Sequence, residues 1–262
     1  MSLRVLTLGS RAVGDWSRAL HAYAQREKDL TVGVAKTEKP QDGQVFGAPV
    51  QVVIDGPYGG SSIDLGEYES VLLFSGGSGI TFTLGMLDDI VGRVVRLGRS
   101  GGERTKRIEF AWCIRSFGAF NWRVALRGWG FAYQSTVGHI QWVAPMLIDI
   151  AAAVAGSSSL DLHFSIFVTC LCDPEAVPPI PNSVVTMERP PAHQLLNDMI
   201  TPPADGVSGA LRWVGPGGGL GICASGPSRL TREMANAVGK LSLSGRANVI
   251  GGLALHTETF AL

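Results

Sequence analysis

A continuous hydrophobic run, Val71 to Phe74, leads directly into the glycine-rich segment Ser75 to Thr81, and a helical pattern begins at about Ile80. Such a run is typical of a strand buried on both faces of a parallel sheet. Glycines after the strand allow a tight turn with exposed N–H groups, and a helix N-terminus adds partial positive charge. The segment therefore predicts a phosphate or pyrophosphate site. Its spacing is G-G-x-G and not G-x-G-x-x-G, so an ordinary strand-to-helix turn is the alternative.

The chain after this loop repeats the rhythm of strand and helix. The first helix is predicted from one apolar face, formed by Leu84, Leu87, Ile90 or Val91, and Val94. Further strands are predicted at 108–114, 160–169, 220–223 and 252–256, and further helices at 143–154, 192–200 and from Ser228, as N-cap, to about Lys240. The proline-rich stretch 173–203 is otherwise predicted to be loop. This alternation predicts a doubly wound parallel sheet, in which ligands bind beyond the carboxyl ends of the strands.

The first sixty positions follow a different pattern. Strands are predicted at 3–8, 31–35 and 50–54, and a short helix opens at Gly14-Asp15-Trp16-Ser17. These strands are too few to close a barrel. The sequence therefore predicts two parts, namely residues 1–60, which resemble the end of a domain, and an α/β domain at 61–262.

Composition and charge exclude several functions. Lys+Arg and Asp+Glu each count 22 in the 262 residues, which gives no reason to expect nucleic-acid binding. The longest apolar stretch, Ile140 to Gly156, contains Asp149 and is too short to span a membrane. Since the first residues show no signal-peptide pattern, a soluble, cytoplasmic chain is expected. The cysteines at 113, 170, 172 and 223 lack metal-ligand spacing, so we expect reduced thiols and no zinc.

Five segments, in this order, resemble the C-terminal half of fungal ferric reductases and the related NADPH oxidases, within the ferredoxin–NADP reductase superfamily. They are Gly14-Asp15-Trp16-Ser17, Gly56-Pro57-Tyr58-Gly59, Ser75-Gly76-Gly77-Ser78-Gly79-Ile80-Thr81, Trp112-Cys113-Ile114-Arg115-Ser116, and Cys223-Ala224-Ser225-Gly226-Pro227 with the tail His256-Thr257-Glu258-Thr259-Phe260. The resemblance implies that residues 1–60 are a remnant of an antiparallel flavin-binding β-barrel. It also implies a ferredoxin-reductase-like NADP-binding domain over 61–262.

The activity that this resemblance implies is electron transfer from NADPH through FAD to a ferric chelate. In full-length relatives a membrane haem domain lies between the flavin and the chelate, and the nucleotide-binding domain faces the cytosol. The cofactors carry out this chemistry while the protein orients them, so no acid–base dyad is expected. The alternatives are a soluble NAD(P)H–flavin reductase and a non-catalytic NADP-binding fragment.

The resemblance also implies roles for particular residues. The segment from Ser75 through Gly76, Gly77, Ser78, Gly79 and Ile80 to Thr81 matches the cradle of the NADPH pyrophosphate, and we expect Gly79→Val to block NADPH sterically without disturbing the fold. Arg115 and Ser116 match the site of the 2′-phosphate, a solvated strand-end charge being the alternative for Arg115. Gly56, Pro57, Tyr58 and Gly59 match the join between the flavin and nucleotide domains, or are an ordinary turn.

The end of the chain matches the region around the reacting rings. Cys223, Gly226 and Pro227 match the segment near the nicotinamide, where Ser225 replaces the cysteine common in the family. Phe260 matches the aromatic residue that covers the flavin, although two residues follow it and a core position is the alternative. Ser225 and Phe260 are therefore the predicted catalytic residues.

Two departures from the family change the expectations. The His-Pro-Phe-Thr-like segment of the flavin barrel is not found upstream, so the chain as given should hold FAD poorly. In addition, Gly118-Ala119-Phe120-Asn121-Trp122 is echoed by Gly138-His139-Ile140-Gln141-Trp142. Residues at about 119–138 therefore read as an insertion, which is either a lid over the nucleotide or translated non-coding sequence.

Overall fold

The computed structural model describes residues 14–34, 49–51, 60–114, 139–157, 159–169, 179–201, 214 and 216–260. The chain divides into two compact units, residues 1–60 and 61–262. Several predicted features lie outside the described residues: the strands at 3–8 and 52–54, the turn at 56–59, Arg115 and Ser116, the insertion at 119–138, and the cysteines at 170 and 172.

The described part of the first unit is mainly the helix α1 (Asp15–Val34). It begins after Gly14, whose N–H donates to Ser17 Oγ while the Ser17 hydroxyl donates to the Gly14 carbonyl. Because α1 continues to Val34, the strand predicted at 31–35 is wrong over 31–34. Thr31, Val32 and Val34 favour a strand individually, but this preference is weak and yields to the helical context. The identity of residues 1–60 as a barrel remnant remains a prediction.

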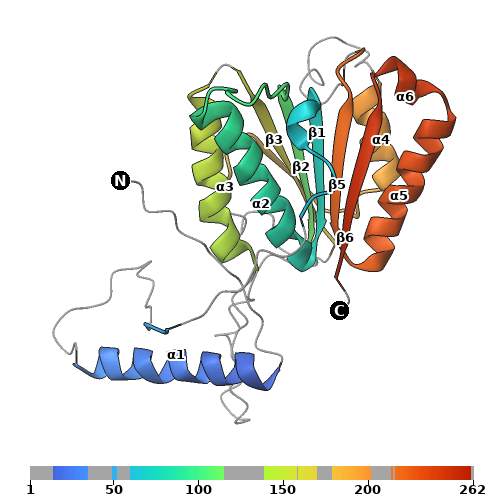
Figure 1. Ribbon diagram of the computed structural model, residues 1–262. Coiled ribbons are helices and arrows are strands. Elements are labelled where there is room, and N and C mark those ends of the chain that lie inside the picture. Colours follow the sequence, from blue (N-terminus) through green and yellow to red (C-terminus); the bar gives the residue numbers. More distant parts are fainter. Residues whose placement is uncertain are drawn as a thin grey trace. The chain divides into compact units, whose positions relative to one another are not determined.

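The second unit is built on six parallel strands in the order β4-β3-β2-β1-β5-β6 (Figure 1). Their bounds are β1 Ser70–Gly76, β2 Arg107–Ile114, β3 Asp161–Val168, β4 Ser183–Thr186, β5 Leu220–Gly226 and β6 Leu253–Thr259. In β1 every residue is buried, as its unbroken hydrophobic run predicted. The predicted doubly wound parallel sheet is therefore confirmed.

Helices cover both faces of this sheet, with one hydrophobic core on each side. The helices α2 (Ile80–Val91) and α3 (His139–Ala155) pack on one face, and α4 (Ala192–Ile200) and α5 (Ser228–Leu243) on the other. A π-helical turn, η3 (Gly92–Arg96), prolongs α2, so that the predicted apolar face from Leu84 to Val94 is buried throughout. Short helices complete the unit: η1 (Leu65–Glu67), η2 (Gly77–Gly79) and α6 (Arg246–Val249).

Two local predictions for this unit are wrong. The stretch predicted to be loop contains β4, an edge strand that pairs with β3 from Phe164↔Ser183 to Phe167↔Thr186. Its four residues lie in a proline-rich stretch and are too short to show a pattern of their own. Ser228 is also not an N-cap, because it is the first helical residue of α5 and the cap position belongs to Pro227, without a side-chain hydrogen bond.

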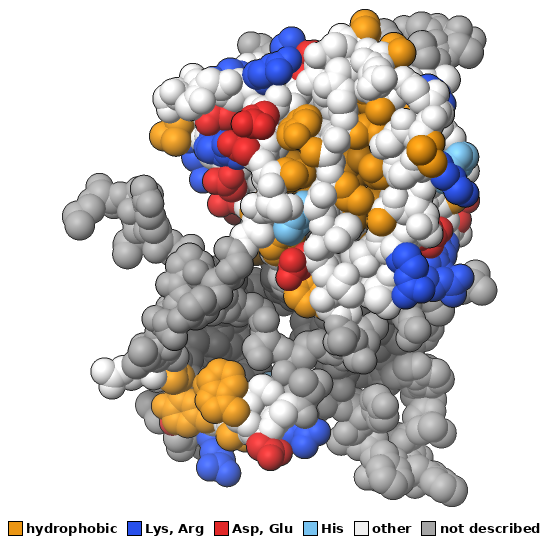
Figure 2. Space-filling model, turned by 45° about the vertical axis from the view of Figure 1, so that its right-hand side comes forward, with side chains coloured by type: hydrophobic (Ala, Val, Ile, Leu, Met, Phe, Trp, Pro, Cys, Tyr) orange, Lys and Arg blue, Asp and Glu red, His pale blue; other side chains and the backbone are white. Residues whose placement is uncertain are grey.

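The edge strand β6 gives one side of the unit an apolar surface. Leu253 and Leu255 on β6 are only partly buried against the core. Figure 2 shows hydrophobic side chains gathered on the face that carries this strand.

No helix in the described part of the chain is long and apolar enough to cross a membrane.

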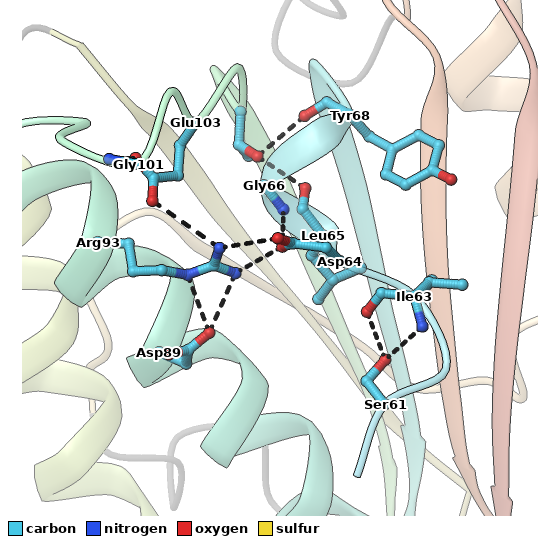
Figure 3. Close-up of polar contacts among 11 residues, drawn as sticks. Ser61, Ile63, Asp64, Leu65, Gly66, Tyr68, Asp89, Arg93, Gly101 and Glu103 are labelled. Atoms are coloured by element: carbon cyan, nitrogen blue, oxygen red, sulfur yellow. Dashed lines mark hydrogen bonds and ion pairs between the residues drawn. The ribbon is translucent and has the colours of Figure 1, made fainter.

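At the amino ends of the strands, one arginine joins three segments of the second unit (Figure 3). Arg93 Nη2 lies 2.9 Å from Asp64 Oδ1, and Arg93 Nε donates to Asp89 Oδ2 over 3.1 Å. A longer ion pair of 3.8 Å joins Arg93 Nη1 to Glu103 Oε1. The hydrogen bond from Arg93 holds the pKa of Asp64 below its usual value of 3.8, against the effect of partial burial. Arg93 therefore ties the end of α2 to the segment before β1 and to the loop before β2.

Candidate functional site

The strand order sets a topological switch point between β1 and β5, where the chain reverses its direction of winding. The surface between the loops that follow these two strands is called the switch-point crevice below. From β1 the chain moves outward through β2 and β3 to β4, and then returns to place β5 and β6 on the other side of β1. The loops after β1 and β5 therefore leave the sheet in opposite directions from neighbouring strands. In open α/β sheets, this switch point at the carboxyl ends is where ligands bind.

The loop after β1 turns directly into a helix. Gly77 has φ +55°, a left-handed conformation that glycine adopts without steric cost, and a side chain there would meet open space. The short η2 then leads into α2, whose cap residue Gly79 has no side-chain cap hydrogen bond. The first N–H of α2, that of Ile80, donates to the Gly77 and Ser78 carbonyls. By helix geometry, the N–H groups that lack an intrahelical acceptor are those of η2, which could bind an anion together with the helix dipole.

The end of β5 closes the other side of the crevice. Gly226 has φ +150°, and a Cβ built on it would lie 3.0 Å from the Gly76 carbonyl oxygen. A Cβ on Gly76 would lie 2.6 Å from Leu230 Cδ1 at the start of α5. Glycine at these two positions lets β1 and β5 end in close contact, with the N-termini of α2 and α5 at the same edge.

The role predicted for Gly79 needs correction. A Cβ at Gly79 would lie 2.2 Å from the Ser225 carbonyl oxygen and 2.8 Å from the Gly226 nitrogen. The close approach that requires glycine is therefore between α2 and the backbone of β5. The expectation that Gly79→Val would leave the fold intact is wrong.

Ser225 carries a polar group that the fold leaves unsatisfied. Its residue is fully buried, and Ser225 Oγ has no hydrogen-bond partner among the described residues. It pairs in register with Ser75 at the end of β1. A buried hydroxyl without a partner costs free energy. Ser225 Oγ is therefore a candidate hydrogen-bond partner for a ligand.

The cysteine near this site is a poor nucleophile. Burial, with a smaller contribution from Glu258, raises the pKa of Cys223 to about 12. Burial also raises the pKa of Cys113 at the end of β2. Both thiols are therefore protonated at neutral pH and serve as small apolar groups.

The tail of the chain is tied to the crevice. The Phe260 N–H donates to the Gly226 carbonyl over 3.0 Å, and the hydroxyls of Thr231 and Thr259 lie 3.1 Å apart. Phe260 is 36% exposed, so it is not a core residue. It is left at the surface next to the end of β5.

The structure thus gathers most of the predicted residues at one edge of the sheet. Ser75 to Thr81, Cys223 to Pro227 and Phe260 all belong to the ends of β1, β5 and β6 or to the turns that follow them. Arg115 and Ser116 directly follow β2, the parallel neighbour of β1, and themselves lie outside the described residues, as do Gly56, Pro57, Tyr58 and Gly59.

One residue of this site had no predicted role. Trp112 on β2 is fully buried, and its Nε1–H donates to the Gly77 carbonyl over 3.1 Å. Its place on an apolar strand indicates only a core residue. The hydrogen bond depends on the register between β1 and β2, which the sequence does not reveal.

Two hollows in the second unit lie at the opposite edge of the sheet. One of about 440 Å³ is lined by Ser61 to Leu65, Met86, Asp89 and Arg93. Another of about 500 Å³ adjoins Asp64, Arg93 and the loops that precede β2 and β5. Both adjoin Asp64 and Arg93, and therefore the ion pairs at the amino ends of the strands. Because glycine turns and helix N-termini point to the carboxyl edge, we assign the site to that edge.

Comparison with known proteins supports the predicted resemblance. Residues 68–128 match the ferric reductase NAD binding domain. The chain is 30% identical over 130 residues to respiratory burst oxidase homolog protein D of Arabidopsis thaliana, an alignment that covers 45% of this chain and 14% of that protein. It is also 30% identical over 120 residues to ferric reductase transmembrane component 1 of Schizosaccharomyces pombe, covering 44% of this chain and 20% of that protein.

These matches confirm the similarity to the C-terminal region of the ferric reductase and NADPH oxidase family. The chain spans only 14% to 20% of the length of these two relatives. A solved structure, the CS-b5R domains of human Ncb5or in its NAD⁺ form, is similar with 13% identity and a TM-score of 0.35, covering 74% of this chain and 37% of that one.

Proposed function

We propose that the second unit binds NADPH at the switch-point crevice and presents its nicotinamide to a flavin, as part of an NADPH-dependent ferric-chelate reductase. The observation that carries the proposal is the close contact of Gly76 with Gly226, between two helix N-termini at the carboxyl edge. The contact brings the two helix N-termini to one edge, where their N–H groups and partial positive charge would bind a pyrophosphate.

The residues present fit such a cofactor. The turn at Gly77 is open on its side-chain side, and α2 lacks a side-chain cap, so both would accept a pyrophosphate. The unpartnered Ser225 Oγ is buried one residue before the end of β5, and we expect it to hydrogen-bond to the carboxamide end of the nucleotide. When bound, the nicotinamide supplies the hydride and a flavin accepts it. The chain's own part is to hold these rings in place and exclude water from them.

The choice of NADPH over NADH is expected to depend on Arg115. It follows β2 directly, and β2 is the parallel neighbour of the strand that feeds the phosphate loop. A guanidinium at this position would bind a 2′-phosphate through charge-assisted hydrogen bonds. FAD, haem and a ferric chelate as further partners rest on the family resemblance.

The test of nucleotide binding uses Ser78, which is partly exposed in η2 and precedes α2. Ser78→Asp adds a negative charge that suits a helix N-terminus but repels a pyrophosphate. We therefore expect unchanged or higher thermal stability together with at least a tenfold weaker Kd for NADPH in calorimetric titration. Ser78→Asn, which is neutral and of the same size, is the control and should bind like the wild type. Equal affinity of all three proteins would remove the loop from the site.

A separate titration tests the preference for NADPH. Charge-assisted hydrogen bonds contribute about 1.5–3 kcal/mol, or roughly ten- to a hundredfold in affinity. Arg115→Ala should weaken NADPH by that factor and leave NADH nearly unchanged, at fixed salt concentration. An equal loss for both nucleotides would show that Arg115 supports the fold or the pyrophosphate site and not the 2′-phosphate site.

A further inference from the structure

The loop Gly77–Gly79, proposed above to bind the pyrophosphate and called the phosphate loop, contacts both β5 and β2, the two neighbours of β1. On the β5 side, Gly79 packs against the Ser225 carbonyl, where no side chain could fit. On the β2 side, the Trp112 indole N–H donates to the Gly77 carbonyl. The loop therefore cannot move toward either strand without losing a contact. This is the kind of rigid support that precise ligand geometry needs.

We propose that Trp112 is a positioning residue for nucleotide binding, and that its indole N–H fixes the loop by holding the Gly77 carbonyl. The inference rests on the proposed function. A carbonyl held on the β2 side fixes the plane of the peptide that joins Gly77 to Ser78. The N–H of Ser78 belongs to that same peptide plane, so its direction is fixed as well. With Gly77 at φ +55°, this N–H and the helix N-terminus then form an arrangement that can bind an anion.

The burial of Trp112 makes this support stiff. The side chain is fully buried in the core that α2 and α3 cover, and the residue pairs in register with Ser75, two positions before Gly77. A buried indole N–H requires an acceptor, so releasing the loop would leave Trp112 Nε1 unpaired, whereas the Gly77 carbonyl would keep only the N–H of Ile80. In the sequence, Trp112 lies three positions before Arg115, which is proposed to bind the 2′-phosphate.

The test compares Trp112→Phe with Phe110→Leu. Phe110 lies two residues earlier on the same face of β2, is as deeply buried, and packs against Phe164. Both changes remove buried volume, but only the first removes the hydrogen bond to the loop. We expect Trp112→Phe to raise the Kd about three- to tenfold, and equally for NADPH, NADH and ADP-ribose, because all three share the pyrophosphate. Phe110→Leu should lower the melting temperature and leave the three Kd values within about twofold.

A second measurement uses the wild-type chain, so the proposal does not depend on the variant folding. The Trp112 indole N–H should exchange slowly with solvent in nuclear magnetic resonance spectra, and NADPH should shift its resonance with the calorimetric Kd. The exposed Trp16 provides the reference for fast exchange. Exchange as fast as that of Trp16, or equal Kd values for wild type and Trp112→Phe, would overturn the inference alone. A wild-type chain that binds none of the three nucleotides would overturn the proposed function as well.

Discussion

At the scale of single residues, the glycines of the loop differ in what they are needed for. Gly77 needs its backbone conformation, since φ is +55° and the space beyond it is open. Gly79 needs the absence of a Cβ, because the β5 backbone occupies that position. A sequence shows both as the same letter in the same motif, so the two requirements separate only in three dimensions.

The first prediction follows from Gly79. Gly79→Ala should lower the free energy of unfolding by about 1–3 kcal/mol or more, because α2 must move away from the rigid backbone of β5. Gly85→Ala is the control, since that position lies within α2 and a Cβ there meets nothing within 4 Å. The control should raise the free energy of unfolding by about 0.5–1 kcal/mol. Urea unfolding of the three proteins measures both effects, and a neutral Gly79→Ala would contradict the packing.

The second prediction concerns the buried thiol of Cys223. Its pKa is raised to about 12 in the folded chain, from an ordinary value of 9.0. The unfolded chain therefore loses this proton first as the pH rises. The stabilisation is fully present below pH 9 and is lost between pH 9 and about 12, at up to roughly 1.4 kcal/mol per pH unit. Cys223→Ala should show a shallower fall in unfolding free energy over pH 9–11 than the wild type. Parallel pH profiles would show that the thiol contributes nothing.

At the scale of elements, Arg93 fixes the end of α2 against two other segments. Its guanidinium is 25% exposed and lies among Asp64, Asp89 and Glu103, of which the Glu103 side chain is 6% exposed. A network that includes a buried carboxylate contributes more than a single surface pair. The other end of α2 follows the glycine loop, so this cluster holds the helix whose N-terminus is proposed to bind the pyrophosphate.

The third prediction is that Arg93→Met lowers the free energy of unfolding by about 1–2 kcal/mol. Arg96→Met is the matched control, because Arg96 and its partner Asp88 are both more than half exposed, and it should change stability by less than about 0.5 kcal/mol. The lowered pKa of Asp64 makes its share of the stabilisation present above pH 3.8 and lost as the pH falls through the folded value. The difference between wild type and Arg93→Met should therefore shrink in acid, and a constant difference would contradict the ion-pair account.

The fourth prediction concerns the insertion at about 119–138, which lies outside the described residues. Joining Gly118 to His139 by deleting residues 119–138 should raise the melting temperature if the insertion is not part of the functional protein. A long loop carries closure entropy, and exposed aromatic residues promote association. The matching NADPH titration distinguishes the alternatives. A lower melting temperature with lost NADPH binding would support a lid over the nucleotide.

The sequence predicted the elements wherever burial imposes a pattern. The unbroken run of β1, the apolar face of α2 and the bounds of α4 follow from burial alone. The strand β4 was missed because a short edge strand among prolines has no such pattern, and α1 was predicted too short because β-branched residues occupy its last turn. At the site, composition predicted the glycine loop, but the Trp112–Gly77 bond and the Gly79–Ser225 contact depend on strand register, which a single sequence does not contain.

At the scale of the whole molecule, the reaction proposed for this chain needs an electron acceptor besides the nucleotide. The second unit provides a six-stranded parallel sheet, and Phe260 is exposed next to Gly226 at the edge proposed to bind the nucleotide. A hydride donor needs an acceptor in contact with it. An activity assay that compares different electron acceptors therefore identifies the acceptor that the chain uses.

The fifth prediction is that the chain oxidises NADPH only when flavin is added. If residues 1–60 are a barrel remnant, FAD should bind weakly, so the rate should keep rising at FAD concentrations well above that of the protein. A rate that also depends on the concentration of a ferric chelate, measured without oxygen, supports the ferric-chelate reductase, whereas a rate set by flavin alone supports a flavin reductase. Ser78→Asp is the control, because its weaker NADPH binding should lower the rate at NADPH concentrations below the Kd while the fold is kept. NADPH binding without oxidation under any of these conditions would identify a non-catalytic NADP-binding fragment. Since that outcome leaves the crevice intact as a nucleotide site, it would contradict the assigned reaction and not the assigned ligand.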